Sequence, residues 1–160
     1  MNHQEEIAES WLDRSKQTED PFARFTFLWF GFNALYSQSE ANRERSAIRD
    51  FIHRQKIRFG QDFMSDVLES NAVGFFKDRV VRDARGNGED TAEYAVHLKS
   101  SEWSVDKRFR SLLMILYLVR CNLFHGSKTF VRDCDQEVVE RAAVLVALIM
   151  EKYFRSFENR

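Results

Sequence analysis

The chain has 160 residues, 44% of them hydrophobic, and a formal net charge of −1. This length and hydrophobic content fit a single domain over residues 1–160 with its own core. The near-zero charge excludes a uniformly basic nucleic-acid-binding protein, so any phosphate contact must come from local patches.

Targeting and cofactor motifs are not found in this sequence. Residues 1–20 are acidic and polar, and no apolar run reaches the ~18 residues that span a bilayer. Two cysteines are too few for a disulfide framework. There is no glycine-rich phosphate loop, no His-Glu-x-x-His zinc motif and no Cys-x-x-Cys pair. We therefore expect a cytoplasmic protein with no membrane contact, metal or cofactor.

The first two predicted helices differ in character. Residues 4–18 place apolar side chains at helical spacing among charges, which predicts an amphipathic helix. Asp20 followed by Pro21 predicts the start of a second helix, with an acidic N-cap and proline at the first helical position. This second helix is apolar nearly all round. Its polar exceptions, Arg24 and Asn33, are interpreted as structural because each is a single polar group on an apolar helix.

The middle of the chain is more polar. Residues 40–59 predict a charged helix with six basic side chains, for which a solvated face is the ordinary interpretation and an RNA-facing surface the alternative. Residues 63–81 predict one or two short helices, and residues 83–90 predict an exposed loop because they combine glycine, charge and no periodicity. Residues 91–103 remain ambiguous. His97 is expected at the surface and Trp103 at the edge of the core.

The longest apolar run predicts the central helix of the protein. Ser104 is expected to cap it, and it should end at His125, where Gly126 can adopt a left-handed conformation. A final helix is expected to start at Asp133 or Asp135 and to run through about residue 157. We therefore predict an all-α bundle of about five helices, in which the helices starting at residues 21 and 104 form the central buried pair.

Candidate chemistry lies at the end of the central helix, in Arg120, Asn122 and His125. Asn122 and His125 are three residues apart and share a helix face, so the amide can orient the imidazole. An arginine can grip a phosphate bidentately, and a histidine can move a proton in either direction near neutral pH. RNA supplies its own nucleophile, the 2′-hydroxyl. An arginine and a histidine at the same helix end therefore suit phosphodiester cleavage.

Such cleavage needs both a base and an acid, which one histidine cannot easily be at once. A two-fold axis that brings two copies together supplies two histidines and two arginines, so this hypothesis predicts a homodimer. In the structural alternative, Arg120 pairs with a carboxylate of a neighbouring helix and His125 is a polar cap, favoured by the helix dipole.

At these residues the chain resembles the HEPN superfamily, whose signature is R-x4-6-H near the end of a long helix. Here the motif runs from Arg120 to His125, and the aromatic segment 28–36 is similar to a helix of several bacterial HEPN groups. The residue after Arg120 is Cys121, where HEPN ribonucleases commonly carry a polar side chain, and Asn122 follows one place later.

The resemblance implies an all-α HEPN-like domain that cleaves RNA without a metal at a composite dimer interface, often as a toxin or defence component. It implies Arg120 and His125 as the catalytic pair, with Asn122 as an orienting group. Lys128 and Arg132, just beyond the helix, are candidates for holding flanking phosphates. RNA, a second copy and an antitoxin or other protein are the candidate partners. The alternative is a non-catalytic HEPN-like module that binds nucleotide, RNA or protein.

Overall fold

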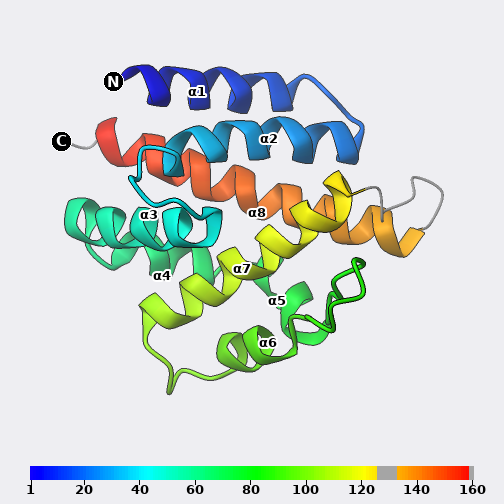
Figure 1. Ribbon diagram of the computed structural model, residues 1–160. Coiled ribbons are helices and arrows are strands. Elements are labelled where there is room, and N and C mark those ends of the chain that lie inside the picture. Colours follow the sequence, from blue (N-terminus) through cyan, green and yellow to red (C-terminus); the bar gives the residue numbers. More distant parts are fainter. Residues whose placement is uncertain (126–132, 159–160) are drawn as a thin grey trace.

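The computed structural model describes residues 1–125 and 133–158, which fold into helices joined by short connections (Figure 1). The helices of the described residues are α1 (His3–Lys16), α2 (Pro21–Tyr36), α3 (Glu44–Phe59), α4 (Asp62–Leu68), α5 (Asn71–Asp78), α6 (Ala92–Lys99), α7 (Val105–Phe124) and α8 (Asp133–Glu158). The predicted all-α bundle is confirmed, but these eight helices exceed the expected five or so. Short helices account for the difference, because residues 63–81 divide into α4 and α5 and the ambiguous segment contains α6.

Two helix starts are capped as the sequence predicts. The Asp20 carboxylate accepts the backbone N–H groups of Phe22 and Ala23, with Pro21 at the first helical position. The Ser104 hydroxyl accepts the N–H of Lys107 at 3.2 Å. These bonds satisfy backbone donors that have no partner inside the helix, so they fix where α2 and α7 begin.

Helices α1 and α2 pack with their backbones in close approach. A Cβ atom on Gly31 would lie 2.9 Å from the Ala8 carbonyl oxygen and 2.6 Å from the Met150 methyl group of α8. Only glycine fits this point without displacing backbone. Arg24, which was interpreted as structural, donates from Nε and Nη2 to the Thr18 carbonyl at 3.1 and 2.7 Å. It thus holds the connection between the two helices, in agreement with that interpretation.

The helix that joins the bundle together is α8 rather than the predicted pair of α2 and α7. α8 packs against α1, α2, α4, α5 and α7, whereas α7 packs mainly on α3, α4, α6 and α8 (Figure 1). Both α2 and α7 are extensively buried, and they meet through ring contacts such as Trp29 with Tyr117. α8 has 26 residues, about 39 Å of helix, which is long enough to reach both of them.

One histidine lies deeper than the sequence suggested. His97 was expected at the surface but is buried, and its Nδ1 lies 2.8 Å from the Ser111 hydroxyl of α7. The ring of Trp103 packs edge-on against it, which places Trp103 at the edge of the core as predicted. The partner on α7 allows a polar ring to be buried on α6.

None of the helices in the described ranges is both long and apolar enough to cross a membrane.

Candidate functional site

The C-terminal end of α7 carries the predicted residues. His125 is the C-cap of this helix, and its backbone N–H donates to the Cys121 carbonyl at 3.0 Å. The imidazole is exposed to solvent. The helix therefore ends at His125 as predicted, although Gly126, which was expected to end it, lies outside the described residues. Lys128 and Arg132, the predicted phosphate-holding residues, also lie outside them.

Arg120 is half-buried and lies beside a carboxylate of α3. Its Nη1 is 3.3 Å from Glu44 Oε2, and the two side chains are 25% and 24% exposed. Its guanidinium also lies 4.9 Å from the centre of the Phe124 ring. Nε of Arg120 is buried and has no hydrogen-bond partner among the described residues. The arginine is thus positioned by a carboxylate and an aromatic ring, and part of its donor capacity is unused.

Glu44 is itself held by a second helix. The Tyr36 hydroxyl at the end of α2 donates to Glu44 Oε1. Burial, together with this bond to a carboxylate, raises the pKa of Tyr36 well above its ordinary value. The hydroxyl therefore remains a donor across the ordinary pH range. Glu44 joins Tyr36 of α2 to Arg120 of α7, and its place in the first turn of α3 also suits the helix dipole.

The predicted pair lies on one helix end but on different faces of it. Arg120 and His125 are five residues apart, which is about 140° around an α-helix. The side chain of Phe124, 39% exposed, follows between them in the sequence. In one subunit, the Arg120 cation and the His125 imidazole therefore point in two directions around the same end of α7. A phosphate gripped by both requires either the long reach of the arginine or a second subunit.

Asn122 is buried and tied to the loop before α6. Its amide nitrogen donates to the Arg82 carbonyl at 2.7 Å, and its amide oxygen accepts the Ala84 N–H at 3.0 Å. The side chain is 1% exposed. These bonds engage both the oxygen and the nitrogen of the amide. They support a role in fixing the loop against α7, while orientation of His125 by Asn122 stays a prediction.

The 83–90 loop is exposed as predicted, but it is organised around a buried carboxylate. Asp83 accepts hydrogen bonds from the Arg85 guanidinium and from the Asn87 amide at 3.0 Å. The bond from Arg85 is the main reason that the pKa of Asp83 lies far below its ordinary value. Gly86 and Gly88 have positive φ angles of 75° and 77°, which lets the loop turn tightly around this group.

A partly exposed aromatic surface borders the same end of α7, and sequence reasoning did not locate it. It consists of Trp11 from α1, Phe27 and Phe30 from α2, and Phe124 from α7. The ring centres of Phe30 and Phe124 are 6.2 Å apart, and those of Trp11 and Phe30 are 5.2 Å apart. Phe30 is 41% exposed. The abundance of phenylalanine was visible in the sequence, but the meeting of three helices at this point was not.

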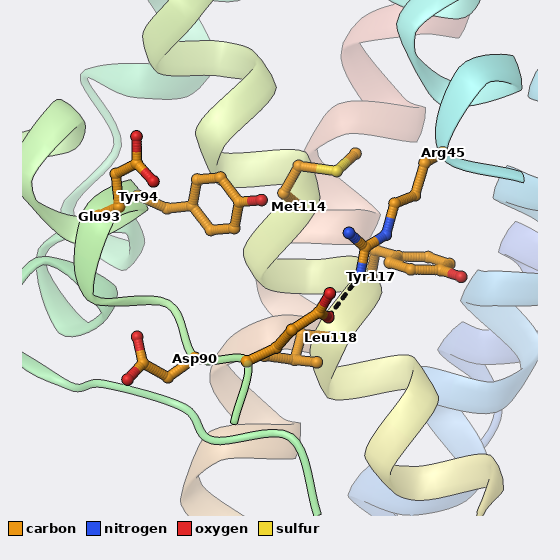
Figure 2. Close-up of a pocket in the computed structure, with 8 residues that line it drawn as sticks. Arg45, Asp90, Glu93, Tyr94, Met114, Tyr117 and Leu118 are labelled. Atoms are coloured by element: carbon orange, nitrogen blue, oxygen red, sulfur yellow. Dashed lines mark hydrogen bonds and ion pairs between the residues drawn. The ribbon is translucent and has the colours of Figure 1, made fainter. Parts of the chain in front are cut away.

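A small hollow of about 200 Å³ lies farther along α7, toward its N-terminus (Figure 2). Arg45 of α3 crosses it to Glu89 at 2.6 Å and lies over the Tyr117 ring. Two more carboxylates line it, those of Asp90 and Glu93. With three carboxylates and one arginine, the hollow repels anions. It therefore does not suit a phosphate, unlike the end of α7 that carries Arg120.

Comparison with known proteins gives no relative: no family model, curated protein or solved structure matches the chain.

Proposed function

We propose that this chain is a homodimeric, metal-independent endoribonuclease of the HEPN type, in which Arg120 and His125 act on the scissile phosphate. The observation that carries the proposal is the emergence of both side chains at the end of an otherwise buried helix. His125 is exposed, and Arg120 is 25% exposed with an unused buried donor. A cation held in place at the same helix end as an accessible imidazole supplies two of the groups that RNA cleavage through the 2′-hydroxyl requires.

In the proposed reaction one His125 takes the proton of the RNA 2′-hydroxyl. The 2′-oxygen then forms a bond to phosphorus, and the bond from phosphorus to the 5′-oxygen breaks. The second His125, in its protonated form, gives its proton to that leaving oxygen. The products are a 2′,3′-cyclic phosphate and a 5′-hydroxyl. Arg120 stabilises the negative charge that builds up on the non-bridging oxygens.

The geometry of one subunit supports the two-subunit arrangement. Arg120 and His125 point about 140° apart around α7, and one histidine is a poor base and acid at the same time. The aromatic surface of Trp11, Phe27, Phe30 and Phe124 borders them and is partly exposed. A two-fold axis next to this surface would cover it with the same surface of the second copy and would bring the two helix ends together.

Glu44 has a defined part in this proposal. Its ion pair at 3.3 Å keeps the Arg120 guanidinium at the rim before RNA arrives. A phosphate then competes with Glu44 for the guanidinium. Because both side chains are about one quarter exposed, the ion pair is weakened by solvent and can be exchanged at small cost. The hydroxyl of Tyr36 continues to bind Glu44 after the exchange.

A second candidate function is a non-catalytic HEPN-like module that binds nucleotide, RNA or a protein partner. The observations that favour it are the partners of the motif residues. Arg120 already has a carboxylate beside it, and the Asn122 amide is bonded to the 82–84 backbone. In that case the same surfaces bind a ligand without turnover. An antitoxin protein seated on the aromatic surface would belong to either candidate.

Incubation of the pure protein with single-stranded RNA in EDTA distinguishes the two candidates. We expect cleavage by the natural chain and a loss of at least about a hundredfold in both Arg120→Ala and His125→Ala, the usual range for removing an acid or base being 10²–10⁴. His3→Ala, which changes an exposed histidine of α1, is the matched control and should cleave normally.

Light scattering should give the mass of a dimer, and circular dichroism should show that the variants remain folded. Equal cleavage by all four proteins would assign the activity to a contaminant. RNA binding without any cleavage would favour the second candidate.

A further inference from the structure

Helix α3 carries a row of basic side chains that the proposed reaction does not use. Arg45, Arg49, His53 and Lys56 are spaced by four, four and three residues, so they share one face of the helix. Arg49, His53 and Lys56 are exposed. The sequence alone left a solvated face and an RNA-facing surface as alternatives for this helix. The surroundings of the row in the folded chain favour the second.

The row borders a cleft between α3 and the first half of α7. The cleft has a volume of about 510 Å³, and it is lined by Arg49, Ile52, His53, Lys56, Ile57, Asp106 and Arg110. Lys56 and Asp106 neutralise each other across it at 2.6 Å. Arg49 and Arg110 form no ion pair with any described residue. The cleft therefore keeps two arginine charges and a histidine facing the solvent, in a chain whose total formal charge is −1.

The hollow of about 200 Å³ farther along α7 has a different charge. Glu89, Asp90 and Glu93 line it, and Figure 2 shows Asp90 and Glu93 on the other side of α7 from Arg45. Arg45 pairs with Glu89 there. A chain of phosphates is attracted by the cleft beside α3 and repelled by the carboxylates of this hollow. The charge distribution thus favours the cleft as the place for a polyanion.

The floor of the cleft is apolar. Ile52 and Ile57 line it, and Ile57 is 74% exposed, the largest exposure of any large apolar residue in the described part of the chain. Unpaired bases and sugars can pack on such side chains, whereas the bases of a duplex are stacked and paired and are not available to them. This combination of basic rim and apolar floor fits a single strand better than a duplex.

We propose that the cleft between α3 and α7 binds backbone phosphates of single-stranded RNA at a distance from the bond that is cut, through Arg49 and Arg110. This inference rests on the proposed function for the identity of the polyanion. Arg110 and Arg120 are ten residues apart on α7, which is about 15 Å along the helix axis. The cleft therefore contributes binding that is equal in the ground state and the transition state, and it affects KM rather than kcat.

The first test measures binding without turnover. His125→Ala serves as the background, and the affinity for a fluorescein-labelled single-stranded oligoribonucleotide is measured by anisotropy over a range of salt concentrations. Adding Arg49→Gln and Arg110→Gln should weaken binding roughly tenfold at low salt. It should also reduce the slope of log K against log salt by about 1.4, because each lost phosphate contact on a single strand contributes about 0.7.

The control pair is Arg79→Gln with Arg155→Gln, two exposed arginines that do not line the cleft. It removes the same total charge and should leave both affinity and slope nearly unchanged. An unchanged slope in the cleft variant, or an equal loss in the control pair, would overturn the inference.

The second test uses turnover by the otherwise natural chain. The cleft variant should raise KM for a long oligonucleotide at least fivefold with kcat retained, and it should leave cleavage of a dinucleotide unaffected, because a dinucleotide is too short to reach the cleft. The two proposals fail in different ways. RNA binding that depends on Arg49 and Arg110 without any cleavage would refute the nuclease alone. Cleavage that depends on His125 but not on these arginines for any substrate length would refute the cleft alone.

Discussion

Two clusters of glutamate, arginine and tyrosine join helices in this molecule, and they differ in how completely their polar atoms are used. In the closed cluster, Glu5 of α1 accepts the Tyr153 hydroxyl of α8 at 2.7 Å and the Arg58 guanidinium of α3 at 3.2 Å. Its other carboxylate oxygen accepts the Asn2 backbone N–H at 2.8 Å. The Glu5 side chain is only 4% exposed. Nothing is left on this carboxylate for a ligand.

The open cluster, formed by Tyr36, Glu44 and Arg120, has the same composition and a different geometry. Tyr36 and Arg120 bind different oxygens of Glu44, and the carboxylate is 24% exposed. Nε of Arg120 lacks a partner in the described part of the chain. The exposed residues Phe124 and His125 come four and five positions after Arg120, at the end of α7.

The two clusters therefore use their arginines differently: Arg58 serves stability, whereas Arg120 is available for binding. A buried carboxylate with every oxygen satisfied fixes three helices and is costly to disturb. A partly exposed pair with a spare donor contributes little to stability and can change partners. Residue composition is the same in both clusters, and Arg58 is even more exposed than Arg120, at 39% against 25%. The exposure of the carboxylate and the unused Nε of Arg120, rather than residue type, therefore mark the open cluster as a candidate site.

The largest expected effect on stability comes from removing the two carboxylates in turn. Glu5→Ala should lower the free energy of unfolding by about 2 kcal/mol, because it leaves the Tyr153 hydroxyl without its acceptor in a buried joint. Glu44→Ala should cost less, about 1 kcal/mol. It also takes the acceptor from a buried hydroxyl, that of Tyr36, but the ion pair that it removes is partly exposed and weak. Urea unfolding followed by tryptophan fluorescence measures both.

Glu6→Ala is the control for the first variant, because Glu6 occupies the same first turn of α1 but is exposed. Glu6→Ala should lower the free energy of unfolding by no more than a few tenths of a kcal/mol. If Glu44→Ala destabilised the protein more than Glu5→Ala, the assignment of closed and open clusters would be reversed.

A smaller effect is expected from acid. Burial alone would raise the pKa of Glu5, but the hydrogen bonds from Asn2, Tyr153 and Arg58 outweigh it and lower that pKa below its ordinary value of 4.5. A depressed carboxyl pKa adds stability above the pKa of the unfolded chain, and that stability is lost as the pH falls through the folded-state pKa. The stability difference between the natural chain and Glu5→Gln should therefore be constant from pH 7 to about pH 5.5 and should shrink toward pH 3.

Unfolding at a series of pH values measures this difference directly. Taking the difference between two proteins cancels the other acid-sensitive groups, such as Asp83. A stability gap that stayed constant down to pH 3 would show that the charge of Glu5 is not what the closed cluster depends on.

The sequence predicted those parts of the fold and site that depend on neighbours along the chain. The caps at Asp20 and Ser104 and the helix end at His125 are local patterns, because a short side chain bonds to an N–H two or three residues away. Arg120 was placed at the rim of a buried helix because the apolar run ends there. These features need no knowledge of the tertiary contacts.

The parts that sequence reasoning missed depend on contacts between distant segments. Glu44 and Arg120 are 76 residues apart, so their pairing depends on how α3 and α7 pack. The bond from Asn122 to Arg82 has the same origin. His97 was expected at the surface because its neighbours in the chain are polar, but the partner that permits its burial is Ser111 on another helix. Similarly, α8 joins the bundle because of its length and position, not because of stronger hydrophobicity.

The smallest predicted effect is also the most direct test of the open cluster. In Glu44→Gln the amide oxygen can still accept the Tyr36 hydroxyl, but the negative charge that competes with phosphate for Arg120 is gone. A partly exposed ion pair is worth about 0.5–1 kcal/mol, so RNA should bind about twofold to fivefold more tightly at low salt. Glu69→Gln, which removes the same charge from an exposed position after α4, controls for the change in net charge and should alter affinity much less. Anisotropy titrations of both variants on the His125→Ala background would measure the difference. Equal tightening by both would mean that Arg120 senses only the overall charge, whereas tightening by Glu44→Gln alone would show that RNA and Glu44 compete for the same guanidinium.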